Sequence, residues 1–206
     1  MTIGPYLAWM GLMLALPTSA WAYASRAAVA GILLVAFMML AWSRRPPSAS
    51  EIAWGVGAGL LVCALWIFPE QFDTYRRFLV IGGDAKSGVE PSPYDPEVCG
   101  WALTIAKLIG SAFIIAPAEE LFFRSFLYRW IQGGNARIDR LDIGAFLWTT
   151  ALFALEHDRW LAGAMAGTIY GILAIRKGLL SAIVAHIVTN FALGVYVILR
   201  GEWAFW

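Results

Sequence analysis

Long stretches without charge constrain this chain more than any other feature of its sequence. Five runs contain no Asp, Glu, Lys or Arg: Gly4 to Ala24, Ala27 to Trp42, Ile52 to Pro69, Trp160 to Ile175, and Gly178 to Leu199. A helix that crosses a bilayer needs about 20 mostly apolar residues. Over the whole chain 60% of residues are hydrophobic and 14% are charged, whereas soluble domains carry about 25% charged residues. This composition excludes an ordinary soluble globule, a disordered chain and a nucleic-acid binder.

Two further apolar stretches contain charges. Ile143 to Leu155 is a shorter uncharged run that continues into Glu156 and His157. The long stretch from Trp101 to Ile131 is interrupted by Lys107, Glu119, Glu120, Arg124 and Arg129. The sequence therefore predicts an all-α, polytopic transmembrane helical bundle of seven spans, or eight if the long stretch breaks at Pro117.

The composition predicts a single integral-membrane domain over residues 1–206, with a core of about 101–199. The Ala20-Trp21-Ala22 pattern resembles a signal-peptide cleavage site, but no Lys or Arg precedes the first run, so a retained helix is predicted. Ser48 and Glu51 predict a capping box at the start of the third span. Residues 70–99 are rich in acids, Pro and Gly, which predicts an extramembrane loop with little secondary structure.

The Lys and Arg count favours a cytoplasmic N-terminus. With the Arg44 and Arg45 loop inside, seven bases lie inside: Arg44, Arg45, Arg129, Arg137, Arg140, Arg176 and Lys177. Six then lie outside: Arg26, Arg76, Arg77, Lys86, Arg159 and Arg200. The positive-inside rule favours this orientation by a small margin.

Titratable side chains within apolar segments are candidates for function, because charges at the centre of a membrane helix are costly. They fall into three clusters, which are Glu119-Glu120-Leu-Phe-Phe-Arg124, Phe153-Ala-Leu-Glu-His157 and His186-Ile-Val-Thr-Asn190. Residues four apart share a helix face, so we expect Glu120 to pair with Arg124. Glu119 then points about 100° away and is left free to act.

Helix depth predicts that the three clusters meet. At about 1.5 Å per residue from the inner helix ends, Glu119 and Asn190 lie roughly 18 Å deep, His157 about 21 Å and His186 about 12 Å. A carboxylate in such a layer can take a proton from water, and a histidine can orient that water or protonate a leaving amine. An imidazole N–H and a carboxamide can stabilise an oxyanion. The set fits amide hydrolysis by an activated water inside a membrane.

The three clusters together resemble the CAAX-protease and bacteriocin-processing (CPBP) family of intramembrane glutamic proteases, whose pattern is EExxxR, FxxxH and HxxxN. The resemblance implies that Glu119 is the water-activating base and that Glu120 and Arg124 support it. It implies that His157 is the second catalytic residue and that His186 and Asn190 form the oxyanion hole. Phe153 is expected to pack against this site.

The layout of essentially the whole chain, most firmly from Trp101 onward, is also similar to the CAAX-protease-related branch of bacteria with exosortase systems. Glu156-His157 continuing into Trp160-Leu-Ala-Gly163 and the tail from Thr189 to Trp206 carry this similarity. It implies residence in the bacterial inner membrane and a membrane-anchored protein substrate with a C-terminal sorting tail. No cofactor is expected.

Alternatives remain open for these residues. Glu119, His157 and His186 could form a three-ligand catalytic zinc site, and a non-catalytic scaffold that binds a partner helix would also carry buried polar groups. Glu156 is interpreted as a solvated or supporting residue, and Lys107 as a side chain that reaches the membrane interface. The glycine repeats Gly163/Gly167/Gly171 and Gly55/Gly59 favour internal helix packing, with substrate docking on the Gly163 face as the alternative.

Overall fold

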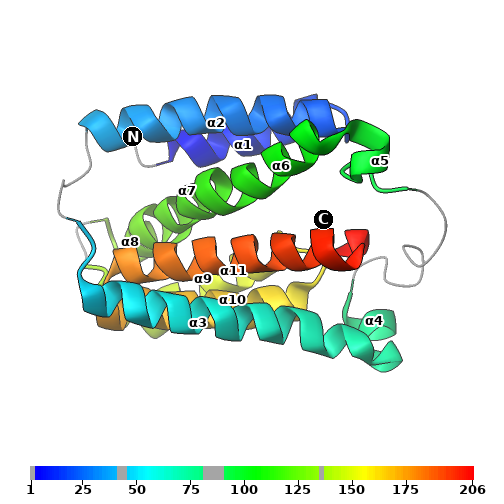
Figure 1. Cartoon of the computed structure of the whole chain (residues 1–206). Helices are drawn as coiled ribbons and strands as arrows, with labels where there is room; N and C mark the ends of the chain where they lie inside the picture. Colours follow the sequence, from blue (N-terminus) through cyan, green and yellow to red (C-terminus); the bar gives the residue numbers. More distant parts are fainter. Residues whose placement is uncertain (1–2, 41–45, 81–90, 135–136) are drawn as a thin grey trace.

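A computed structural model describes residues 3–40, 46–80, 91–134 and 137–206. Every regular element in these ranges is helical (Figure 1). The α-helices are α1 (Gly4–Ala15), α2 (Ala20–Leu40), α3 (Ala49–Ile67), α4 (Asp73–Leu79), α5 (Pro96–Cys99), α6 (Trp101–Ile109), α7 (Ala116–Glu120), α8 (Tyr128–Ile131), α9 (Ile143–Leu155), α10 (Trp160–Lys177) and α11 (Leu179–Arg200). Short 3₁₀ segments are η1 (Phe68–Gln71) and η4 (Trp203–Phe205), and π-helical segments are η2 (Gly110–Ile115) and η3 (Leu121–Leu127).

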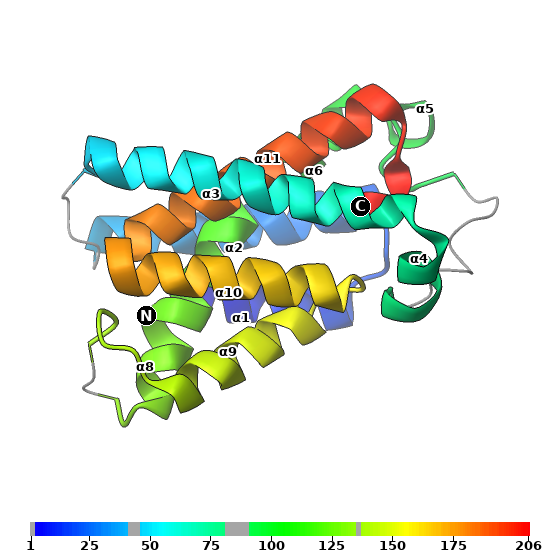
Figure 2. The same ribbon diagram turned by 90° about the horizontal axis from the view of Figure 1, so that it is seen from below.

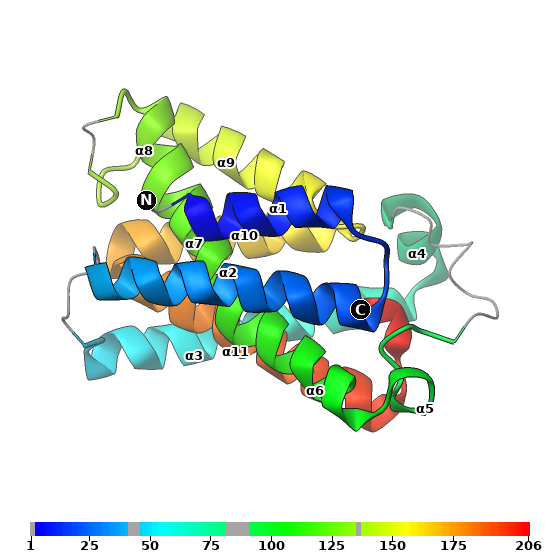
Figure 3. The same ribbon diagram turned by 90° about the horizontal axis from the view of Figure 1, so that it is seen from above.

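The long helices lie side by side along one direction. Helices α1 and α2 form one layer, and α3, α9, α10 and α11 form the opposite side, with α6 to α8 running obliquely between them (Figures 1 and 2). The α1–α2 connection, α5, the α9–α10 connection and the C-terminal segment gather at one end, while the end of α8 and the α10–α11 junction lie at the other (Figure 3). The all-helical prediction is confirmed.

Four helical stretches are long and apolar enough to cross a membrane. They are Ala20–Leu40, Ala49–Gln71, Trp101–Ile131 and Leu179–Arg200. Helices α1 and α9 have 12 and 13 residues, which is below the roughly 17 residues that a spanning helix needs. Multiple apolar helices of this kind are typical of a multi-pass membrane protein, and the structure supports four of the seven predicted spans.

The first predicted span, Gly4 to Ala24, is wrong. Helix α1 ends at Ala15, and Leu16 is extended with φ −111° and ψ 148° because the following Pro17 disfavours the helical conformation. Helix α2 then begins at Ala20, where the Ser19 Oγ accepts a hydrogen bond of 3.2 Å from the Ala22 N–H. The second helix therefore includes Arg26, which is buried in α2 rather than lying in an outside loop.

The predicted alternative of a break at Pro117 is also wrong. Helical structure runs without interruption from Trp101 to Ile131. The π-helical segment η2 ends directly before α7, and the Ala116 N–H bonds to the Ser111 carbonyl one residue further back than in an α-helix. This wider turn accommodates the proline ring and its missing N–H without ending the helix.

Other predictions at the helix ends have mixed outcomes. The capping box is confirmed, because the Glu51 N–H donates to Ser48 Oγ at 3.2 Å and the Ser48 N–H donates to Glu51 Oε2 at 2.8 Å. The 70–99 segment carries η1, α4 and α5, so it has more helix than predicted. Arg44, Arg45 and Lys86, which entered the orientation prediction, lie outside the described residues.

Glycines bring the long helices into close contact. A Cβ at Gly59 would lie 2.5 Å from the Ala185 carbonyl oxygen, and one at Gly55 would lie 2.6 Å from a Val184 methyl, both on α11. On α10, Gly163, Gly167 and Gly171 are in contact with α9. These glycines pack helices within the molecule, so the Gly163 face is covered by α9 and is not a free docking surface.

We predict that Gly59→Leu destabilises the bundle by roughly 1–3 kcal/mol, because the new side chain overlaps the α11 backbone. The thermal unfolding midpoint of the purified protein in detergent measures this effect. Gly57→Leu on the same helix is the control, since a Cβ at Gly57 meets nothing within 4 Å. Equal midpoints for the two variants would contradict the proposed close packing of α3 on α11.

Candidate active site

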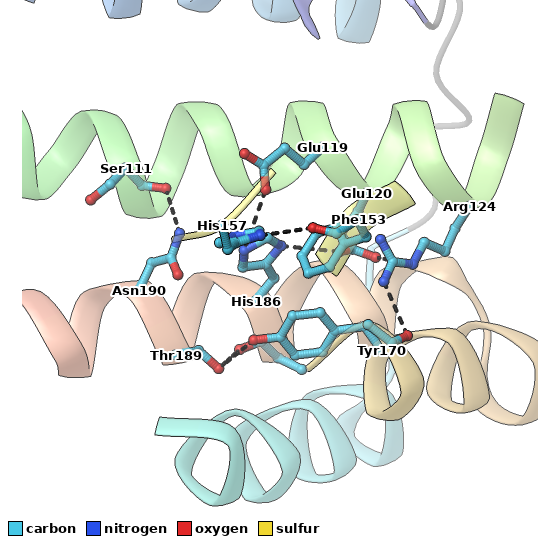
Figure 4. A network of polar contacts seen from close by, with 12 residues as sticks. Ser111, Glu119, Glu120, Arg124, Phe153, His157, Tyr170, His186, Thr189 and Asn190 are labelled. Carbon is cyan, nitrogen blue, oxygen red and sulfur yellow. Dashed lines mark hydrogen bonds and ion pairs between the residues drawn. The ribbon is translucent and has the colours of Figure 1, made fainter. Parts of the chain in front are cut away.

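Three separate parts of the chain bring the predicted residues together (Figure 4). Glu119 and Glu120 lie at the end of α7, and Arg124 follows in η3. His186 and Asn190 lie on α11. The described helix α9 ends at Leu155, so His157 lies in the connection just beyond it rather than within a span as predicted. All six residues nevertheless converge on one region.

His186 lies between the two acids. Its Nδ1 is 3.0 Å from Glu120 Oε1, and its Nε2 is 3.6 Å from Glu119 Oε2. The adjacent carboxylates therefore contact opposite nitrogens of one ring. Glu119 faces this imidazole rather than Arg124, and its side chain remains 13% exposed.

Glu120 and Arg124 form the predicted pair. Arg124 Nε lies 3.3 Å from Glu120 Oε2, and Arg124 Nη2 donates to the Gly167 carbonyl on α10 at 3.1 Å. The guanidinium also lies 4.5 Å from the centre of the Phe153 ring. Glu120 is 0% exposed and Arg124 is 4% exposed, so this ion pair is held out of solvent.

The hydrogen bond of His157 fixes which of its nitrogens carries a proton. Its Nδ1 lies 2.8 Å from the Phe153 carbonyl oxygen. Because a carbonyl oxygen only accepts, Nδ1 is the donor, and Nε2 of the neutral ring keeps a lone pair. The ring packs edge-on against Trp66, at 5.3 Å between centroids, and against Phe153 at 4.8 Å. As predicted, Phe153 packs against the site, where it contacts both His157 and His186.

The Asn190 side chain on α11 bonds to the continuous helical stretch from Trp101 to Ile131. Its Nδ2 donates to the Ser111 carbonyl at 3.1 Å. A carboxamide NH₂ has two donors, so this bond uses one and leaves the other. Ser111 is in η2, the π-helical segment that precedes the two acids.

Tyr170 and Thr189 are part of this network and were not predicted. The Tyr170 ring stacks on the His186 ring with centroids 4.8 Å apart and planes at 25°. Its hydroxyl donates to Thr189 Oγ1 at 2.7 Å, and Thr189 Oγ1 donates to the Gly59 carbonyl at 2.9 Å. The one signal in the sequence is a tyrosine placed among the small residues Gly163, Gly167 and Gly171 of α10.

A cavity of about 240 Å³ joins the candidate residues. Glu119, His157, His186 and Asn190 all line it, whereas Glu120 and Arg124 do not. Glu156, predicted to point away, is on its wall while being solvent-exposed. Lys107 also lines the cavity, with its Nζ 4.1 Å from the centre of the Tyr23 ring, so the prediction that it reaches the membrane interface is wrong.

The arrangement of the possible ligands bears on the zinc alternative. Among the described residues, no group of three His, Cys, Asp or Glu side chains is placed to hold a metal ion. His186 has carboxylates at both nitrogens, and His157 uses Nδ1 on a backbone carbonyl. Glu119, His157 and His186 therefore do not form a three-ligand metal site.

The fold and the cavity define a class of protein, namely a helical membrane protein with an acid–imidazole–carboxamide site enclosed between its helices. Residues 101–192 match the family described as type II CAAX prenyl endopeptidase Rce1-like, and this segment carries all three motifs. No curated protein and no solved structure matches the chain. This match supports an Rce1-like CAAX prenyl endopeptidase family domain over residues 101–192, and with it an enzyme of the peptidase class and intramembrane endopeptidase activity.

We predict that Arg124→Met destabilises the protein by about 3–5 kcal/mol, because it leaves the buried Glu120 without its cation. Unfolding midpoints in detergent measure the loss. The double variant Glu120→Gln/Arg124→Met should regain a large part of it, since no unpaired carboxylate remains. A double variant that is no more stable than Arg124→Met would show that the uncompensated charge is not the cause.

Proposed function

We propose that the chain is an intramembrane endopeptidase in which Glu119 activates a water molecule for attack on a peptide bond. One observation carries this proposal: Glu119, His157, His186 and Asn190 line a single cavity. A general base, a proton carrier and two potential oxyanion donors are the groups that metal-independent amide hydrolysis requires.

The two acids have different roles because their surroundings differ. Glu120 is 0% exposed and contacts both Arg124 and His186. It is therefore a structural anion that orients the Arg124 guanidinium and the His186 ring. Glu119 is on the cavity wall and 13% exposed, so water can reach its carboxylate. Glu119 is accordingly the base that accepts the proton of the attacking water.

His157 is the proposed partner of that water. With Nδ1 bound to the Phe153 carbonyl, the lone pair of Nε2 is free to accept a hydrogen bond from water in the neutral ring. A proton that arrives on Nε2 can then pass to the leaving amine. The ring is held in place by Trp66 and Phe153.

His186 and Asn190 are the proposed oxyanion donors. When His186 donates from Nδ1 to Glu120 and is protonated, its Nε2–H faces the side of the cavity where Glu119 lies. The Asn190 carboxamide has its second N–H left after the bond to Ser111. Each such donor contributes about 10²–10³ to the rate in acyl transfer.

For the substrate, we propose C-terminal sorting or anchor tails of membrane proteins in the bacterial inner membrane, cleaved by a single domain over residues 1–206. The similarity of Glu156-His157 through Gly163, and of the tail from Thr189 to Trp206, to the exosortase-associated branch supports this proposal. Coexpression with candidate tail proteins, followed by intact-mass analysis, identifies the cleaved substrate.

We predict that Glu119→Gln abolishes cleavage and leaves the fold intact, because the amide keeps the shape of the side chain and cannot act as a base. The mass shift of a coexpressed tail protein and the unfolding midpoint of the purified enzyme are the two measurements. Glu97→Gln, at an exposed position of α5, is the control and should retain activity. A folded Glu119→Gln variant that still cleaves would remove the base assignment. Full in vivo function without cleavage would favour a scaffold instead.

We further predict that EDTA and 1,10-phenanthroline leave the cleavage rate of the purified enzyme unchanged. In the proposed mechanism Glu119 activates the water and no side-chain group holds a metal ion. Loss of activity with chelators, restored by added zinc, would contradict this mechanism.

A further inference from the structure

Two cations lie among aromatic rings at the end of the bundle where α5 lies. Lys107 Nζ is 4.1 Å from the centre of the Tyr23 ring and 4.6 Å from that of Tyr94. The Arg26 guanidinium is 5.2 Å from the centre of the Trp9 ring. We call these five residues the cation–aromatic cluster. Trp9 packs edge-on against Tyr23, which packs against Tyr94, so the rings form a continuous group that holds both cations.

Both cations are short of negative partners. Arg26 is 5% exposed, and its Nε has no hydrogen-bond partner. Within the described part of the chain, no carboxylate lies within ion-pair distance of Arg26 or Lys107. Burial raises the pKa of Tyr94, and the positive charge of Arg26 opposes that shift. Lys107 contacts the same ring. Aromatic faces stabilise a cation by less than the cost of withdrawing it from water.

The cluster opens into the catalytic cavity. Trp9, Tyr23 and Lys107 line the same cavity as Glu119 and His157. Lys107 and Glu119 are both on the continuous helical stretch from Trp101 to Ile131, and their separation along it is roughly 18 Å at 1.5 Å per residue. An extended peptide covers this length with about five residues at ~3.3 Å each. One bound polypeptide can therefore reach both groups.

We propose that the cation–aromatic cluster is a substrate subsite that binds a carboxylate of the polypeptide, with Lys107 as the contacting cation. The proposal rests on the proposed function of the same cavity. Arg26 contacts the Trp9 ring without lining the cavity and adds positive potential, while Lys107 is the cation on the cavity wall. An anion that enters with the substrate supplies the negative charge that the described residues do not. The carboxylate comes from the chain end or from an acidic side chain, within about five residues of the bond that is cleaved.

Binding to the inactive Glu119→Gln protein in phosphatidylcholine nanodiscs tests this subsite without requiring cleavage. The probes are three dansyl-labelled Leu/Ala hexapeptides: a free C-terminal acid, its C-terminal amide, and an amide with Glu as its last residue. Fluorescence anisotropy should give about tenfold tighter binding for at least one carboxylate probe than for the plain amide. Tighter binding of the free C-terminal acid identifies the chain end as the source of the carboxylate. Tighter binding of the Glu-containing amide identifies an acidic side chain. Equal affinities for all three probes would overturn the proposal.

Variants of Lys107 then test whether this residue causes the carboxylate preference. Lys107→Met in the Glu119→Gln background should remove the carboxylate preference, whereas Lys107→Arg should keep it and shows that a positive charge is sufficient. Lys177→Met is the matched control, because Lys177 Nζ also lies over an aromatic ring, at 4.6 Å from the centre of Trp54, but outside the catalytic cavity. A preference that survives Lys107→Met overturns the proposal.

The same anisotropy measurement distinguishes a bound lipid from a bound substrate. If phosphatidylglycerol in the nanodisc abolishes the preference that is seen in phosphatidylcholine, a lipid phosphate occupies the subsite and the substrate proposal fails. A carboxylate preference together with no cleavage by the unsubstituted protein, which retains Glu119, would refute the proposed function alone. Cleavage by the unsubstituted protein, together with equal binding of the carboxylate and amide probes, would refute the subsite alone.

Discussion

The buried charge network around Glu120 is the interaction on which the rest of the site depends. Glu120 contacts Arg124 on its own helical stretch and His186 on α11, and Arg124 reaches the Gly167 carbonyl on α10. Three helical segments are therefore connected through a carboxylate that is fully withdrawn from solvent. Removing one partner of such a pair costs several kcal/mol, so this network penalises any rotation that separates them. That constraint aims the neighbouring Glu119 at the cavity.

The π-helical segments on either side of α7 give this arrangement its shape. The Ser111 carbonyl in η2 accepts both the Ala116 N–H of its own helix and the Asn190 side chain of α11. A wider turn tilts carbonyls away from the helix axis, which makes one available to a second donor. The same segment lets the helix continue through Pro117, so the cavity wall from Lys107 to Glu119 is one continuous element. The π-helical irregularity here connects the proposed catalytic groups to the rest of the cavity.

Local spacing predicted the parts of the site that a single helix determines. The Glu120–Arg124 pair follows from a separation of four residues, and the Ser48–Glu51 box follows from cap chemistry. Contacts between distant residues were beyond reach, because they depend on how helices rotate against each other. The stacking of Tyr170 on His186 and the position of Lys107 between Tyr23 and Tyr94 are of this kind. Hydropathy does not reveal the break before Pro17, because this break comes from the conformational effect of proline on Leu16 and not from a change in polarity.

Two electrostatic environments differ in their relation to the cavity: the buried charges of Glu120 and Arg124 lie outside its lining, whereas Lys107 lines it. At Glu120 the carboxylate contacts Arg124 and His186 within the protein, so these contacts exist before anything binds and can hold the proposed catalytic groups in a fixed geometry. At Lys107 the described residues supply aromatic faces and no anion, so that region gains most from a ligand that brings negative charge. The two proposals therefore assign substrate binding and peptide-bond hydrolysis to different stretches of the same helix. Binding energy gained at the distant stretch can hold a peptide bond against Glu119, which is how contacts remote from the reacting atoms contribute to rate.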